Sequence, residues 1–115
     1  MSIVVLKDRL TRENVVLARE EYDTFIKITI DLDQELVAIG GQYHADAQNI
    51  LIKEYGSKRN IWGGGYSILR KQFETNALIN IQPDKNPSME IVDPQIRERF
   101  LLIAKRALAD IENFV

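Results

Sequence analysis

The sequence contains no cysteine and has only one histidine, one tryptophan and three prolines among its 115 residues. Without cysteine the chain can form no disulfide, no thiolate metal site and no cysteine nucleophile, and we expect a protein of the reducing cytoplasm. Long apolar runs are missing too, because no stretch approaches the roughly 18 apolar residues of a membrane-spanning helix. We therefore predict that the chain has no membrane contact.

The single histidine also limits metal binding. Zinc sites generally use three or four nitrogen, sulfur or carboxylate ligands, whereas this chain offers His44 with Asp46 two positions later. Distant carboxylates such as Glu74 or Asp84 would have to complete an oxygen-rich magnesium site, and no spacing in the sequence requires one. We predict no metal site and identify no cofactor.

The composition, with 45% apolar and 28% charged residues, is that of one globular domain spanning residues 1–115. The net charge of −2 argues against a general nucleic-acid binder. The charge is unevenly distributed, because residues 53–71 have five basic groups and one acidic group. This basic segment is either an ordinary solvated surface or a patch that receives an anion.

Hydrophobic periodicity predicts an α+β fold with a largely antiparallel sheet and about three helices packed against it. The expected strands are residues 3–6, 25–31, 36–39, 67–73 and 77–81, and the expected helices are residues 11–22, 46–55 and 94–113. The middle strands should form a hairpin, because Ile28 and Ile30 then lie opposite Ile39 and Val37 on one apolar face.

Capping residues mark the expected helix ends. Asp46 is a suitable N-cap for the second helix, and Gly56 supplies a left-handed stop after it. Asp93 followed by Pro94 is a strong start for the last helix. That helix has a wide apolar stripe, extended by Leu102, which covers either the sheet and first helix or a partner subunit.

His44 is the first candidate for chemistry, because histidine alone has an unperturbed pKa near neutrality. It follows the two glycines Gly40 and Gly41, and Asp46 is the nearest group to orient its ring. The alternative is an ordinary turn histidine beside a helix cap. Ser57 lacks the Gly-x-Ser-x-Gly elbow of a nucleophilic serine and is more simply a turn residue.

The glycines at positions 63–65 predict a flexible turn, or a nest of backbone amides to which Lys58 and Arg59 add positive charge. The segment matches no phosphate-loop or dinucleotide pattern. Trp62 beside it either stacks on a planar ligand or packs against the backbone. Alternation along residues 77–81 points Asn80 outward, where it is a further candidate for orienting a ligand.

Several short motifs together resemble a family of small prokaryotic proteins described only as a domain of unknown function. The resemblance spans residues 25–108 and rests on Ala38-Ile39-Gly40-Gly41 before His44-Ala45-Asp46, Gly56-Ser57, Trp62-Gly63, Ile79-Asn80-Ile81 with Pro83, and Val92-Asp93-Pro94 with Ile96-Arg97. Family members often have arginine where this chain has Gln82. The resemblance implies one site that joins His44, Asp46, Ser57, Trp62 and Asn80, and it implies no activity.

Two hypotheses of different kinds follow. In the first, a surface centred on His44 binds a small polar or anionic ligand, with His44, Asp46, Ser57, Lys58, Trp62 and Asn80 as candidate residues. Whether catalysis accompanies this binding is left open. In the second, the chain is a non-enzymatic assembly protein that forms homo-oligomers through its C-terminal helix or an uncovered sheet edge.

Overall fold

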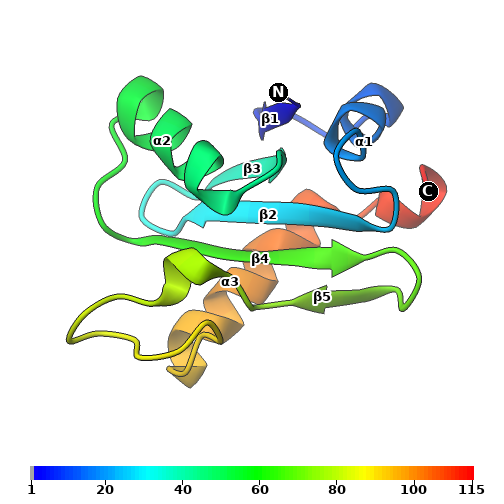
Figure 1. The fold of residues 1–115 in the computed structure, drawn as a ribbon. Helices are drawn as coiled ribbons and strands as arrows, with labels where there is room; N and C mark the ends of the chain where they lie inside the picture. Colours follow the sequence, from blue (N-terminus) through cyan, green and yellow to red (C-terminus); the bar gives the residue numbers. More distant parts are fainter. Residues whose placement is uncertain (1) are drawn as a thin grey trace.

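In the computed structural model, which describes residues 2–115, five strands form one antiparallel sheet in the order β1-β3-β2-β4-β5 (Figure 1). The strands are β1 (Ile3–Leu6), β2 (Phe25–Asp31), β3 (Leu36–Gly40), β4 (Ile61–Ser67) and β5 (Gln72–Glu74). The helices are α1 (Arg12–Ala18), α2 (His44–Tyr55) and α3 (Pro94–Ala107), with short 3-10 turns η1 (Leu78–Asn80) and η2 (Ile111–Asn113). This arrangement confirms the predicted α+β class.

The two faces of the sheet are covered by different helices. The face with Ile26, Ile28 and Ile30 forms the larger core, with Trp62 and Phe100 of α3 packed against it. On the opposite face, α2 and η1 cover a smaller cluster that includes Ala38, Ala47, Leu51 and Ile61 (Figure 1). No helix among residues 2–115 is long and apolar enough to cross a membrane.

The β2–β3 hairpin has the predicted register. Ile28 lies opposite Ile39, and Ile30 lies opposite Val37. Alternation fixed this register because a shift by one residue would turn every isoleucine to the other face. β2 is an interior strand of the sheet, and α2 packs on the face opposite the isoleucines. Thr29 and Asp31 on that face are therefore buried.

The helix boundaries differ in part from those expected. Thr11 caps α1 by accepting a hydrogen bond from the Asn14 amide, but the helix ends at Ala18, short of Tyr22. α2 begins at His44 with Tyr43 at the N-cap position, so the prediction of Asp46 as the cap is wrong: Asp46 lies in the first turn. A carboxylate there still favours the helix, because it faces the positive end of the helix dipole.

The ends of the other helices follow the caps more closely. Gly56 adopts the left-handed conformation with φ 68° and ends α2 as predicted. Asp93 accepts from the Gln95 amide and starts α3 at Pro94. α3 ends at Ala107, where a turn leads into η2, so the expected helix to residue 113 is interrupted.

The prediction of a turn at residues 63–65 is wrong, because these glycines lie inside the central strand β4. A Cβ on Gly64 would lie 2.1 Å from the Glu74 carbonyl oxygen and 2.8 Å from the Phe100 ring. A Cβ on Gly65 would lie 2.1 Å from the Phe25 ring. The glycines therefore make room for aromatic rings that pack directly on the strand. A strand amide pairs with its neighbours, so the anion-nest interpretation fails as well.

The strand expected at residues 67–73 is wrong for most of its length, although it overlaps β5 at Gln72 and Phe73, and the strand expected at residues 77–81 is wrong. Residues 68–71 form a turn between β4 and β5, in which the Ser67 hydroxyl accepts a hydrogen bond from the Arg70 amide. The expected strand at residues 77–81 is the 3-10 turn η1, with the Asn80 amide donating to the Ala77 carbonyl. Short apolar runs are ambiguous because helical turns and strands both tolerate them.

Residues 75–92, called here the 75–92 loop, are organised around two buried asparagines. The Asn86 side-chain nitrogen donates to the carbonyls of Asn80, Ser88 and Glu90, and its oxygen accepts from the Val92 amide. Buried amide groups that satisfy several backbone atoms replace the hydrogen bonds that a sheet would give. The loop thus has a defined conformation although η1 is its only helical turn and it contains no strand.

Candidate functional site

His44 joins the start of α2 to β4. Its Nε2 lies 2.7 Å from the carbonyl oxygen of Gly64, and the side chain is 9% exposed. Because a carbonyl oxygen only accepts, Nε2 carries the proton and donates. The ring lies over Gly63, whose Cβ would come within 2.9 Å of it. The absence of a side chain on β4 therefore creates the space that His44 occupies.

Burial governs the charge of this histidine. Burial is the main cause that lowers the pKa of His44 to about 4; the hydrogen bond to Gly64 opposes this shift, and the positive charge of Lys27 adds to it. The ring is therefore neutral at pH 7. Asp46 makes no hydrogen bond to His44; its amide donates to the Tyr43 carbonyl. The prediction that Asp46 orients the His44 ring is therefore wrong, because the Gly64 carbonyl orients it.

Asn80 and Trp62 are buried, and neither lies on the surface as a ligand contact. The prediction that Asn80 points outward is wrong, because its side chain is fully buried and bonds to both backbone polar groups of Gly63. β5 pairs only with the end of β4, so Asn80 takes the place of a neighbouring strand at Gly63. The Trp62 ring belongs to the larger core, and its Nε1 donates to Asn60 Oδ1 at 2.8 Å.

Ser57 is bound to a buried carboxylate. Its hydroxyl donates to Asp31 Oδ2 at 2.5 Å, and the same carboxylate accepts from the Gln34 side chain and from the Asp33 and Gln34 amides. Burial raises the pKa of Asp31, but these hydrogen bonds together hold it below its ordinary value. Asp31 and Ser57 thus fasten the loop after α2 to the β2–β3 turn.

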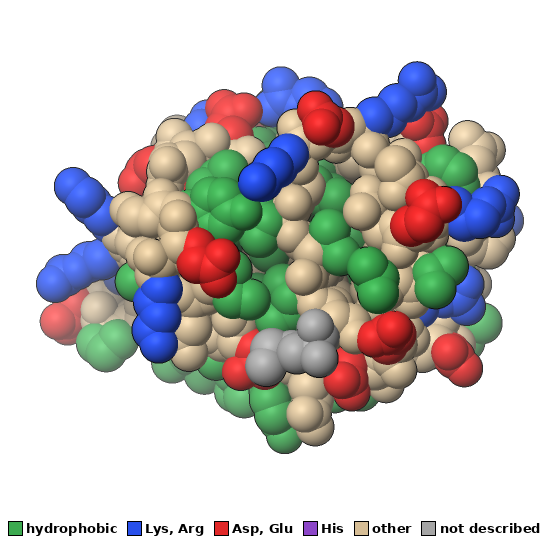
Figure 2. Space-filling model, turned by 90° about the horizontal axis from the view of Figure 1, so that it is seen from above, with side chains coloured by type: hydrophobic (Ala, Val, Ile, Leu, Met, Phe, Trp, Pro, Cys, Tyr) green, Lys and Arg blue, Asp and Glu red, His purple; other side chains and the backbone are tan. Residues whose placement is uncertain are grey.

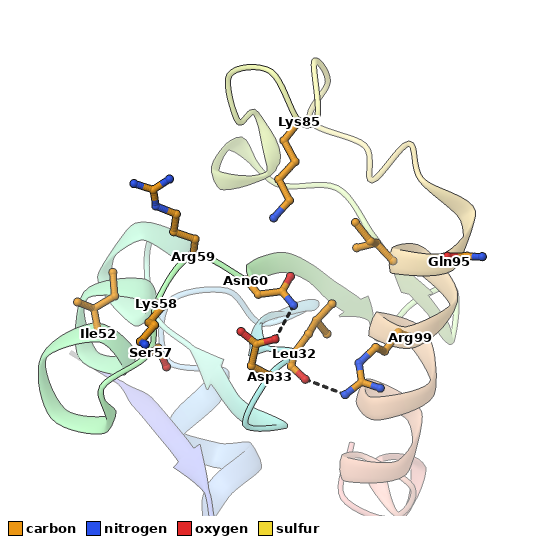
Figure 3. A pocket seen from close by; sticks show the side chains of 11 residues that line it. Leu32, Asp33, Ile52, Ser57, Lys58, Arg59, Asn60, Lys85, Gln95 and Arg99 are labelled. Atoms are coloured by element: carbon orange, nitrogen blue, oxygen red, sulfur yellow. Dashed lines mark hydrogen bonds between the residues drawn. The ribbon is translucent and has the colours of Figure 1, made fainter.

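This fastened corner forms one wall of an open cleft of about 980 Å³, called here the basic cleft (Figure 3). Its lining comes from the β2–β3 turn, α2 and the loop after it, the 75–92 loop and α3. The lining residues are Leu32, Asp33, Ile52, Ser57, Lys58, Arg59, Asn60, Lys85, Gln95, Ile96 and Arg99. Four are cationic and one is a carboxylate, so the cleft has an excess of positive charge.

The single carboxylate of the basic cleft is already engaged, because Asn60 Nδ2 donates to Asp33 Oδ1 at 2.9 Å. Within residues 2–115, Lys58, Arg59 and Lys85 form no ion pair. Figure 3 shows Lys85 reaching down from the 75–92 loop towards Asn60, with Arg99 on the opposite wall. The Lys85 ammonium lies 5.5 Å from the centre of the Trp62 ring.

Arg99 and Lys85 are held in position by the fold. Arg99 Nη2 donates to the Leu32 carbonyl at 2.8 Å and to Glu35 at 3.3 Å. Its Nη1 and Nε form no hydrogen bond with any other described residue, so they can donate to a ligand. Lys85 stands in a tight turn closed by two hydrogen bonds between the backbones of Gln82 and Asn86.

Only two of the six residues selected from the sequence, Ser57 and Lys58, line the basic cleft. Asp46 lines a separate hollow with Asn49 and Lys53. His44, Trp62 and Asn80 are buried around β4, so the single joint site that the family resemblance implies is not formed.

Sequence reasoning missed Lys85 and Arg99 as members of a site. The basic segment 53–71 did point to Lys58 and Arg59, which the cleft contains. Lys85 and Arg99 are far from that segment in the sequence and reach it only through the fold of the 75–92 loop and α3. In the part of the chain that the structure describes, no three histidine or acidic side chains cluster as a metal would require.

Comparison with known proteins gives a family but no activity. Residues 4–107 match a family model described as a protein of unknown function, DUF5674. Searches of curated proteins and of solved structures gave no match.

Proposed function

The chain belongs to the DUF5674 family of proteins of unknown function, and we propose that it binds a small anionic ligand in the basic cleft. The observation that carries this proposal is the group of cations around one cleft: Lys58, Arg59 and Lys85 have no acidic partner among the described residues. Like charges gathered around a hollow repel one another and attract anions from solution. The candidate site is therefore at the C-terminal end of α2, whereas His44 lies at its N-terminal end.

The donors of the cleft are suited to carboxylate or phosphate oxygens. Arg99 has free donors on Nη1 and Nε, and its position is fixed by the bond to the Leu32 carbonyl. Because this guanidinium is already held in place, ligand binding costs little side-chain entropy. More of the free energy of each charge-assisted hydrogen bond therefore contributes to affinity. A volume of about 980 Å³ is at the upper end of the range for small-ligand pockets.

The proposal is one of binding, without a reaction. The only histidine of the chain is buried against β4, and the hydroxyl of Ser57 is committed to Asp31. No residue lining the basic cleft is a histidine.

Trp62 offers a direct test, because it is the only tryptophan and is linked to the cleft through Asn60 and Lys85. We expect citrate or pyrophosphate, added at constant ionic strength, to change its fluorescence with saturation, and calorimetry to give the same dissociation constant. Lys85→Ala and Arg99→Gln should each weaken binding about tenfold, the effect of losing one hydrogen bond to a charged group.

The matched controls are Lys105→Ala and Arg106→Gln. Both residues lie on α3 outside the lining of the cleft, and Arg106, like Arg99, contacts Glu35. These variants remove the same charge and should leave the dissociation constant unchanged. Binding that weakens equally in all four variants would reflect net charge alone and would contradict the proposal, as would the absence of saturable binding.

A second candidate function is self-association through β1. This strand lies at one edge of the sheet, contains the uncharged sequence Ile-Val-Val-Leu and has no strand on its outer side among residues 2–115. Edge strands without charge or proline are prone to pair with another chain. Figure 2 views this side of the molecule and shows apolar side chains surrounded by charged ones of both signs.

The test of self-association is the molar mass by light scattering across micromolar concentrations. We expect a dimer that Val5→Lys converts to a monomer, because a lysine in β1 opposes pairing at the edge. Leu102→Lys on α3 is the comparison, since Leu102 is 62% exposed and lies away from β1. A monomer at every concentration would contradict this second candidate.

A further inference from the structure

Building on the proposed anion binding, we infer that the ligand of the basic cleft carries two anionic groups joined by an apolar segment. The inference rests on how the cations are distributed. Lys58 and Arg59 belong to the loop after α2, whereas Arg99 belongs to α3 on the other side of the cleft (Figure 3). A ligand with two separate anionic groups can contact the cations of both sides at once.

An apolar stretch of the cleft lies beside Arg99, whereas Asp33, Asn60 and, from above, Lys85 occupy the middle of the cleft. Leu32 lies between the Asp33–Asn60 pair and Arg99 (Figure 3), and Ile96 of α3 is also part of the lining. Ile52 adds a half-exposed apolar side chain on the wall formed by α2. A fully charged ligand would have to lose water against these side chains without gaining a polar partner. An apolar segment, in contrast, gains by covering them.

The two sides are rigidly related, which makes a linked ligand favourable. The loop after α2 is fastened by the Ser57–Asp31 hydrogen bond, and Arg99 is fastened to the Leu32 carbonyl. Asp31 and Leu32 are consecutive residues, so both sides are tied to the same short segment. When one anionic group is bound, the second is held near its cations at a high effective concentration, provided that the linker has the right length.

The test uses straight-chain dicarboxylates from succinate to azelate, with the monocarboxylate of each chain length for comparison. Calorimetry and Trp62 fluorescence give the dissociation constants. We expect one chain length to bind at least about tenfold more tightly than its monocarboxylate, with weaker binding on either side of that length. Arg99→Gln and the double variant Lys58→Gln/Arg59→Gln should each abolish the advantage of the dicarboxylate. Arg106→Gln should retain it.

The outcomes separate this inference from the proposed function. If monocarboxylates or inorganic phosphate bind in the cleft and no dicarboxylate binds more tightly, the inference of a two-headed ligand is wrong and anion binding stands. If citrate, pyrophosphate and all the carboxylates fail to bind, both are wrong. An advantage that survives in Arg99→Gln would also contradict the inference, because the second anionic group would then lie elsewhere.

Discussion

His44 donates from Nε2 to the carbonyl oxygen of Gly64 across 2.7 Å and thereby ties the first turn of α2 to the central strand β4. The only histidine of the chain is thus part of the packing between a helix and the sheet. Its neutral form fits this place, because a charged ring would have to lose its water on burial.

This contact predicts how stability depends on pH. The pKa of His44 is lowered to about 4 in the folded protein, against 6.5 for an exposed histidine. Between these values the unfolded chain binds the proton more strongly, so protonation favours unfolding. The free energy of unfolding should be highest above pH 6.5 and fall by about 3 kcal/mol between pH 6.5 and 4.

Urea denaturation at a series of pH values measures this fall. His44→Gln is the matched variant, because it keeps a donor for Gly64 and has no titrating group, and its stability should change much less between pH 6.5 and 5. The proton spectrum of the single histidine gives the same pKa directly. A titration midpoint near 6.5 in the folded protein would contradict the buried position.

A second prediction concerns Asn80, whose side chain bonds to both the amide and the carbonyl of Gly63. Asn80→Ala leaves these two buried groups without partners and should reduce the free energy of unfolding by about 4 kcal/mol. Asn49→Ala, at an exposed position on α2, should change it by less than about 0.5 kcal/mol. Equal stability of the two variants would show that Asn80 does not complete the sheet.

A third prediction concerns the space beside the glycines of β4. Gly64→Ala places a Cβ against the backbone of Glu74, which cannot move without disturbing β5. The substitution should destabilise the protein by about 3 kcal/mol or more, as severe overpacking does. Gly56→Ala meets no atom within 4 Å and costs only its left-handed φ, about 1 kcal/mol. Thermal unfolding distinguishes them, and similar melting temperatures would contradict the packing described here.

A fourth prediction is an increase in stability, at Thr29. The Thr29 hydroxyl is buried under α2 and has no hydrogen-bond partner within the described chain. Thr29→Val keeps the shape and removes the unpaired hydroxyl, so it should stabilise the protein by about 1 kcal/mol. Thr75→Val is the comparison, because the Thr75 hydroxyl donates to Glu90 and its loss should destabilise. Chemical denaturation that shows a loss of stability for Thr29→Val would contradict this assignment.

The sequence predicted the parts of the fold in which local pattern and tertiary packing agree. Ile26, Ile28 and Ile30 alternate because one face of β2 is in the larger core, and the hairpin register followed from that alternation. The starts of α1 and α3 followed from the caps Thr11 and Asp93, which act within a few residues. Such signals need no knowledge of distant segments.

The errors came from residues whose role depends on distant neighbours. The glycines of β4 resemble a turn in isolation, and only the rings of Phe25 and Phe100 explain why a strand needs them. Asn80 was placed outward by alternation, although Gly63 required a partner because β5 pairs only with Gly65 to Ser67 of β4. Arg99 joins Lys58 in one cleft through tertiary structure alone, so no local pattern could include it.

The proposed anion site is the basic cleft and not the surroundings of His44. A heteronuclear NMR titration of the backbone and side-chain NH groups with citrate tests it most directly. We expect saturable shifts of Lys58, of the Asn60 amide groups and of Arg99 Nε, with Gly64 and His44 unchanged. Shifts centred on His44 and Gly64, or no saturable shift in the cleft, would contradict it.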